Sequence, residues 1–196
     1  MANPRVTTTF LLASSSPRRI ELLTDAGFHF ETVAPSTPER DGVDLTVREL
    51  TAWNAVRKAK SVASAHPDKV VLAADTLVAF AGEIIGKPSD LENAREILRR
   101  LSGNTHDVCS AVAICHQPEG RSILFHELSH VRFRQLSDAQ ICDYLAKINP
   151  LDKAGAYAAQ GRGAEIIVRI EGSYSNVVGL PMEKTVPKLA EFGIRL

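Results

Sequence analysis

Residues 10–23 constrain the fold of this chain most, because an apolar run, three serines and a proline follow one another there without a break. The run at 10–13 is short enough for a buried strand. Pro17 stands where a helix is expected to begin, since its missing N–H costs nothing at that position. A strand, a polar turn and a helix N-terminus together point free N–H groups and a partial positive charge at an anion. The stretch therefore predicts an anion site, the alternative being an ordinary serine-capped helix start.

Two arginines make the anion site more specific. Arg18 and Arg19 fall in the first turn of the expected helix, where a cation opposes the helix dipole. They need a compensating interaction, and a bound polyphosphate would supply it. Under the alternative interpretation, both arginines are simply solvated.

Composition limits the classes of protein and partner. A length of 196 residues suggests one domain, in two lobes at most. The formal net charge of +0 gives no overall preference for nucleic acid or an acidic membrane, so anion binding must be local. No segment reaches the ~20 apolar residues of a membrane span, and the N-terminus lacks the apolar core of a secretory signal. Three cysteines without a C-x-x-C pair favour reduced, mostly buried thiols, and we expect a cytoplasmic protein.

Hydrophobic periodicity predicts alternating strands and helices, and hence a mixed sheet in an α/β fold. Strands are expected at 10–13, 28–34, 69–80, 83–86, 108–115, 123–133 and 164–170. Helices are expected at 17–27, 46–65, 89–102 and 137–147, and from residue 181 onward. Capping boxes are expected at Thr46 with Glu49, Ser89 with Glu92 and Ser137 with Gln140. The segments 150–163 and 172–179 are expected to be loops.

Asp75 is the most informative single residue, because it interrupts the most apolar run of the chain. An unpaired carboxylate buried there costs several kcal/mol, so Asp75 must lie at a cleft or beside a cation. Such a carboxylate can activate water or hold a metal; alternatively it closes the strand and bonds the turn. Because its burial is costly, Asp75→Asn is expected to preserve or raise stability. Asn54 and Lys58 lie one helical turn apart and can reach the same point in space.

Three other polar residues are weaker candidates. Glu39 lies in an irregular loop with no apolar face, where most carboxylates are simply solvated. Lys87 follows a predicted strand end and precedes a proline that restricts its backbone. Gln160 stands in a loop rich in glycine and alanine, where an amide can read a nucleotide base. The six histidines show no paired metal-ligand spacing.

Together these segments resemble the Maf family of nucleoside triphosphate pyrophosphatases, in the family's order from residue 10 nearly to the end of the chain. The opening signature comprises Ser14, Ser16, Pro17, Arg18, Arg19, Leu22 and Leu23. The further blocks are AADT at 73–76, GEIIGKP at 82–88, LSGNTH at 101–106, PLDKAGAY at 150–157, QG at 160–161 and IEGSYSNVVGLP at 170–181.

The resemblance implies a two-lobed α/β domain over residues 1–196, with a mixed, twisted sheet around a long cleft, like the fold shared with inosine triphosphate pyrophosphatases. It implies hydrolysis between the α and β phosphates, giving a monophosphate and pyrophosphate, and a divalent cation, Mg²⁺ or Mn²⁺. Asp75 corresponds to the proton acceptor and, with Glu39, to the metal ligands. The phosphate end corresponds to Ser14, Arg19, Lys58 and Lys87.

Three residues indicate a branch of the family. Arg18, Thr76 and Gln160 match the branch that prefers dTTP and UTP, whereas the 7-methyl-GTP branch tends to carry Trp, Gln and Glu there. The resemblance thus assigns base reading to these positions and makes a pyrimidine nucleoside triphosphate the expected partner, in nucleotide pool sanitation. No membrane or stable nucleic acid complex is expected, and a homodimer remains open.

Two departures from the family pattern affect the site. Thr37 and Pro38 stand where the family usually has paired acids beside Glu39, which weakens the expected metal shell. Arg57 stands where an acidic residue often precedes the lysine. The alternatives to a dTTP/UTP enzyme are a pyrophosphatase for another modified or purine nucleotide and a non-catalytic, nucleotide-binding regulator of cell division.

Overall fold

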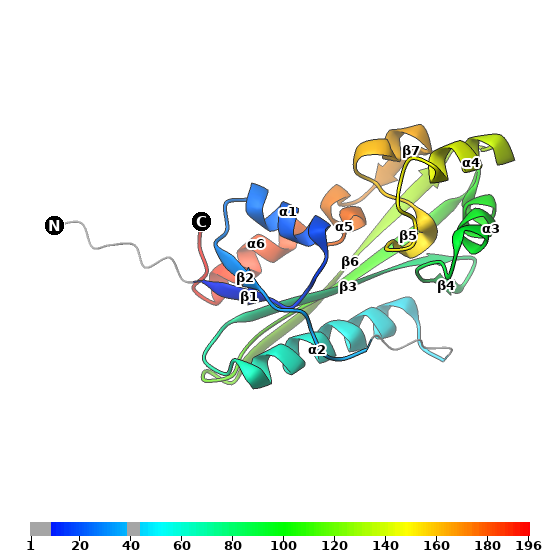
Figure 1. Ribbon diagram of the computed structural model, residues 1–196. Coiled ribbons are helices and arrows are strands. Elements are labelled where there is room, and N and C mark those ends of the chain that lie inside the picture. Colours follow the sequence, from blue (N-terminus) through cyan, green and yellow to red (C-terminus); the bar gives the residue numbers. More distant parts are fainter. Residues whose placement is uncertain (1–8, 39–43) are drawn as a thin grey trace.

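The computed structural model describes residues 9–38 and 44–196, and within them seven strands form one mixed sheet (Figure 1). The strand order is β2-β1-β3-β5-β6-β7, and β4 pairs with β3 off this path. The strands are β1 (Phe10–Leu12), β2 (Phe30–Thr32), β3 (Val71–Phe80), β4 (Glu83–Ile85), β5 (Thr105–His116), β6 (Arg121–Phe133) and β7 (Ile167–Glu171). β1 is parallel to β2 and β3, and the other pairings are antiparallel. This confirms the predicted mixed α/β sheet.

Helices cover both faces of the sheet. They are α1 (Pro17–Asp25), α2 (Val47–Ala65), α3 (Leu91–Leu101), α4 (Asp138–Leu145), α5 (Tyr174–Val178) and α6 (Met182–Glu191), with 3₁₀ turns at Ala154–Ala156 (η1) and Gly161–Glu165 (η2). In Figure 1, α2 lies on one side of the sheet, and α1 and α6 lie on the other. Side chains alternate between the faces with a period of two. Asp75 therefore shares the α2 face with Val71 and Ala73, whereas Thr76 points to the face of α1.

Small residues bring α2 close to the sheet. Ala55, Ala59 and Ala63 pack against Val71 and Ala73 in one buried cluster. The predicted capping box at Thr46 is present, since the Thr46 hydroxyl accepts from the Glu49 N–H and the Glu49 carboxylate accepts from the Thr46 N–H. The cap sets where α2 begins. Because the apolar stripe of α2 consists of small residues, the polar side chains that directly precede those residues in sequence can also reach the sheet.

The edge of β3 is left open in the middle of the strand. On this edge β1 pairs with Leu11 opposite Val71 and Leu12 opposite Leu72, and β4 pairs only from Val78 onward. In the described part of the chain no strand covers the edge between these pairings. Since neighbouring strand residues point to opposite faces, an open edge makes side chains of both faces accessible from one cleft.

Several predicted boundaries were wrong for identifiable reasons. The N-cap of α3 is Asp90, whose carboxylate accepts from the Asn93 N–H at 2.8 Å, so the predicted box of Ser89 with Glu92 does not form. An ionised side chain is the stronger acceptor at a helix N-terminus. β7 begins only at Ile167, after the η2 turn, and the predicted 172–179 loop contains α5.

The cysteines are less buried than expected. Cys109 is buried and Cys115 is half-buried, but Cys142 is exposed. All three are free thiols, as predicted. Among residues 9–38 and 44–196, no helix combines the length and apolarity needed to cross a membrane.

Candidate functional site

A cleft of about 650 Å³ opens at the uncovered edge of β3. Its walls come from the turn after β1, from α1, α2, β3, β4 and β5, from the segment around η1, and from α5 with Gly179. Its charged lining residues are Arg18, Arg19, Lys58, Asp75, Lys87, Asp152 and Lys153. Among the described lining residues, five cationic side chains face two carboxylates, and this excess of positive charge suits the cleft to an anion.

Asp75 lies on the cleft floor and is held by two residues of α2. Lys58 Nζ donates to Asp75 Oδ1 at 2.7 Å, and Asn54 Nδ2 donates to Asp75 Oδ2 at 3.1 Å. All three are buried, with exposures of 6% for Lys58, 3% for Asn54 and 4% for Asp75. The expectation that Asp75 lies at a cleft or beside a cation is confirmed on both counts. Asn54 and Lys58 do reach one point, as their spacing predicted.

The Lys58–Asp75 ion pair overturns the expectation that Asp75→Asn preserves or raises stability. That expectation assumed a carboxylate without a partner. Neutralising one member of a buried pair leaves the other charge uncompensated, which typically costs about 3 to 5 kcal/mol. Because Lys58 would be left in this state, we now expect Asp75→Asn to destabilise the protein.

Arg19 is buried although it stands in the first turn of α1. Its Nε donates to the Gly179 carbonyl at 2.9 Å, and its two terminal nitrogens donate to Ser14 Oγ at 3.2 Å and Thr76 Oγ1 at 3.1 Å. The Thr76 hydroxyl also lies 2.8 Å from Ser110 Oγ and 3.2 Å from the Gly179 oxygen. These acceptors offset the unfavourable dipole and hold a positive charge in the cleft wall. Ser16, at the N-cap, makes no side-chain capping bond, so the serine-capped alternative does not describe this helix.

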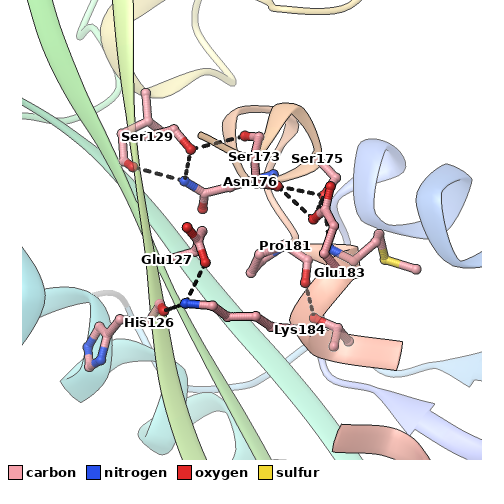
Figure 2. Close-up of polar contacts among 12 residues, drawn as sticks. His126, Glu127, Ser129, Ser173, Ser175, Asn176, Pro181, Glu183 and Lys184 are labelled. Carbon is pink, nitrogen blue, oxygen red and sulfur yellow. Dashed lines mark hydrogen bonds and ion pairs between the residues drawn. The ribbon is translucent and has the colours of Figure 1, made fainter. Parts of the chain in front are cut away.

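Gly179 directly follows α5 in the corner between α5 and α6, and Figure 2 shows the side chains of Ser173, Ser175 and Glu183 that bond to one another in this corner. Glu183 Oε2 accepts from Ser173 Oγ and Ser175 Oγ, both at 2.7 Å, and Ser175 Oγ accepts from the Met182 N–H at 2.9 Å. The Gly179 N–H itself donates to the Ser175 carbonyl at 3.0 Å. Burial raises the pKa of Glu183, but the hydrogen bonds with Ser173, Ser175 and its own backbone outweigh burial and lower the pKa overall, so its carboxylate is charged at neutral pH.

Asn176 ties the same corner to the sheet. Figure 2 shows its side chain between α5 and β6, where Nδ2 donates to Ser129 Oγ at 2.9 Å and to the Val108 carbonyl at 3.0 Å. Asn176 is fully buried. Its backbone carbonyl accepts from Ser110 Oγ at 3.3 Å, which continues the chain of bonds to Thr76 and Arg19.

The mouth of the cleft is bridged by two contacts between α1 and the 149–165 segment. Arg18 donates to Asp152 Oδ2 and to the Asp152 carbonyl, each at 3.2 Å. Gln160 Nε2 donates to Glu21 Oε2 at 3.3 Å. Burial raises the pKa of Asp152, but Lys153 and Arg18 outweigh it and lower the pKa overall.

One side of the cleft is apolar and rests on an aromatic cluster. Tyr157 lines the cleft, and its hydroxyl lies 2.9 Å from His106 Nε2. Phe133 contacts both rings edge to face. Burial lowers the pKa of His106 to about 4, with a small opposing effect from Asp107, and burial raises the pKa of Tyr157.

The described residues satisfy only part of a metal shell. They contain no group of three or more His, Cys, Asp or Glu side chains that could hold a metal ion by themselves. However, Mg²⁺ is commonly bound by one or two carboxylates together with substrate phosphates and water. The buried carboxylate of Asp75 in a cationic cleft fits that donor set. Glu39, the other predicted ligand, lies outside the described residues.

The structure gathers most of the predicted site residues. The lining includes Ser14, Arg18, Arg19, Lys58, Asp75, Thr76 and Lys87. Gln160 is not part of the lining; it lies beside the lining residue Ala159 and contacts Glu21. Sequence reasoning did not place Asn54, Asp152 or Lys153 in the cleft. Signals existed for these residues: Asn54 stands one turn from Lys58, and the other two lie in the segment 150–157.

Comparisons with known proteins agree across nearly the whole chain. The family described as Maf-like protein matches residues 9–192. The dTTP/UTP pyrophosphatase of Symbiobacterium thermophilum is 45% identical, covering 93% of this chain and 93% of that protein. The Geobacillus sp. protein of the same name is 45% identical, with 93% and 97% covered, and that of Dictyoglomus thermophilum is 41% identical, with 95% and 97% covered.

One solved structure of lower similarity matches part of this chain. The Staphylococcus aureus Ham1 protein is 18% identical, with 64% of this chain and 72% of that chain covered and a TM-score of 0.45. That likeness is too low to support an argument. The family match and the relatives above, spanning the strand, cleft and corner already described, show that this chain belongs to the Maf-like protein family.

Proposed function

We propose that this chain hydrolyses nucleoside triphosphates, dTTP and UTP foremost, to the monophosphate and pyrophosphate. The observation that carries the proposal is the buried Asp75–Lys58 pair on the floor of a cationic cleft, in a chain with relatives named dTTP/UTP pyrophosphatase. A carboxylate beside bound phosphates, with a positive wall facing it, is suited to activating water against phosphorus.

In the proposed reaction, Asp75 accepts a proton from a water molecule that attacks the α-phosphorus. The bond from that phosphorus to the oxygen bridging the α and β phosphates breaks, and pyrophosphate leaves. Arg19, Lys58 and Lys87 stabilise the charge of the triphosphate, and Ser14 lies at the same end. A divalent cation bound by Asp75 and Glu39 would supply further neutralisation of phosphate charge.

The base is proposed to lie over the apolar side of the cleft. The lining residues Val78, Val108, Tyr157 and Val177 pack in one cluster there. Arg18 and Gln160 flank the mouth and are proposed to read the base edge. Thr76 is also proposed to act on the base, but its hydroxyl bonds to Arg19, so a change at Thr76 would disturb the phosphate wall as well.

A panel of triphosphates tests the proposal. Purified protein is incubated with dTTP, UTP, CTP, ATP, GTP and 7-methyl-GTP in Mg²⁺ or Mn²⁺, and products are separated by anion-exchange chromatography. We expect monophosphate and pyrophosphate in equal amounts, with dTTP and UTP turned over fastest. Release of the nucleoside diphosphate and orthophosphate would contradict cleavage between the α and β phosphates. Nucleotide binding without turnover would favour a non-catalytic regulator.

A further inference from the structure

Asn54 makes a contact that the proposed reaction does not yet explain. Its side chain is almost fully buried on α2, and its Nδ2 donates to Asp75 Oδ2 at 3.1 Å. Lys58, one turn later on the same helix, donates to the other oxygen, Oδ1, at 2.7 Å. One helix thus supplies one donor to each oxygen of the same carboxylate.

Two donors on two oxygens constrain a carboxylate in a way that one donor cannot. The terminal torsion of Asp is broad and nearly two-fold, so a carboxylate held only by Lys58 can rotate about that bond or exchange its oxygens. A second donor at a different point fixes the plane of the group. An ionised carboxylate has about four acceptor directions, so two bonds leave acceptor capacity for a water or an ion.

We infer that Asn54 is a positioning residue that fixes the plane of the Asp75 carboxylate toward the attacking water. This inference rests on the proposed function. Asn54 acts through Asp75, and its amide carries no charge. Its removal should therefore affect the chemical step more than substrate affinity, since a small misplacement of a reacting group can lower the rate by about 100-fold.

The first test is Asn54→Leu, which keeps the size of the side chain and removes the donor. We expect kcat for dTTP to fall by about 10-fold to 100-fold while KM changes by less than about twofold, the pattern of a lost transition-state interaction. The melting temperature and circular dichroism spectrum are measured on the same preparation. The matched control is Thr51→Val, one turn earlier on α2, because Thr51 is also buried and its hydroxyl donates to the Val47 and Arg48 carbonyls and bonds to Cys109 Sγ at 3.7 Å, away from Asp75. The control should keep wild-type kcat.

Two more variants separate positioning from packing and keep the test decisive if Asn54→Leu does not fold. Asn54→Asp has nearly the same shape but replaces the N–H donor by a second carboxyl group, which repels the Asp75 carboxylate or shares a proton with it, whereas Asn54→Gln keeps the carboxamide. We expect Asn54→Gln to recover a large part of kcat and Asn54→Asp to recover none.

The outcomes distinguish this inference from the function on which it rests. Wild-type turnover of dTTP together with equal kcat values for wild type, Asn54→Leu and Asn54→Asp would overturn the inference alone. Equal losses in Asn54→Leu and Thr51→Val, or equal kcat in Asn54→Asp and Asn54→Gln, would also overturn it. Absence of triphosphate turnover in the wild type would overturn the proposed function and the inference together.

Discussion

At the scale of single residues, the Asp, Lys and Arg side chains that are buried in the described part of the chain, Arg19, Lys58 and Asp75, all have partners. Asp75 and Lys58 form a buried pair, and Asn54 donates to the remaining oxygen. Arg19 is buried among three oxygen acceptors. Stability and proposed chemistry therefore depend on the same side chains, and a substitution must be assessed for both.

Asp75→Asn separates these two roles when combined with a second change. We expect the single variant to lose about 10²-fold to 10⁴-fold in kcat and to unfold more easily by about 3 kcal/mol, because Lys58 keeps its charge without its partner. Asp75→Asn combined with Lys58→Met should recover stability but not activity. Urea denaturation and dTTP turnover measure the two effects. Near-normal turnover in a folded Asp75→Asn protein would contradict the proposed role.

His106 should make stability depend on pH below neutrality. Burial lowers its pKa to about 4, from an ordinary value of about 6.5, so the unfolded chain binds the proton more readily. Neutral His106 therefore makes its full contribution to the free energy of unfolding above about pH 6.5. This contribution declines as the pH falls toward 4, by roughly 3 kcal/mol in all. The free energy of unfolding is measured against pH for wild type and His106→Gln, which keeps a partner for the Tyr157 hydroxyl. The variant should show a shallower decline; an unchanged slope would mean that other groups cause it.

At the scale of elements, the α5–α6 corner connects the C-terminal part of the chain to the cleft. Glu183 joins Ser173 and Ser175, and this corner holds the Gly179 carbonyl that accepts from Arg19. The sheet contributes through Asn176, which bonds to β5 and β6. The corner between α5 and α6 thereby helps to determine where the Arg19 side chain lies.

Glu183→Gln tests this connection. The neutral amide is a weaker acceptor for the two serine hydroxyls, so we expect a stability loss of about 1 kcal/mol and a several-fold rise in KM for dTTP. The matched control is Glu191→Gln on the same helix, because the Glu191 carboxylate bonds to exposed Lys188. Chemical denaturation and steady-state kinetics give both quantities. A KM equal to that of the control would show that the corner does not influence Arg19.

At the scale of the whole molecule, the cleft joins segments far apart in sequence. Arg18 contacts Asp152 across 134 positions, and Gln160 contacts Glu21 across 139. α1 and the 149–165 segment thus meet at the mouth, where the proposed base-reading residues lie. Under the proposed base-reading roles, substrate preference depends on how these two segments are brought together.

Base preference should change when both mouth residues are replaced while Thr76 is left intact. Arg18→Trp combined with Gln160→Glu is expected to lower kcat/KM for dTTP and UTP relative to 7-methyl-GTP, by up to about 10⁴-fold. Since Thr76 bonds to Arg19, keeping it separates specificity from phosphate binding. Glu21→Gln is the control for the lost mouth contact. An unchanged ratio of kcat/KM values would place base reading elsewhere.

Much of the fold and part of the site could be predicted from the sequence alone. The strand–turn–helix opening, the caps at Thr46 and Ser137 and the convergence of Asn54 with Lys58 depend on neighbours within about four residues, where local geometry decides. Asp75 was recognisable because a charge in an apolar strand requires a partner. The cap of α3 was misassigned because two adjacent residues, Ser89 and Asp90, are both suitable acceptors.

Only the tertiary structure decided which distant segments meet. The open edge of β3 exists because β1 ends opposite Leu72 and β4 ends opposite Val78, and strand pairing across such distances leaves no local pattern. The same holds for Lys58 as the partner of Asp75, for Gly179 as the acceptor for Arg19, and for Asp152 and Glu21 at the mouth. Sequence periodicity determines which face of an element is buried, whereas sheet order and register determine what that face meets.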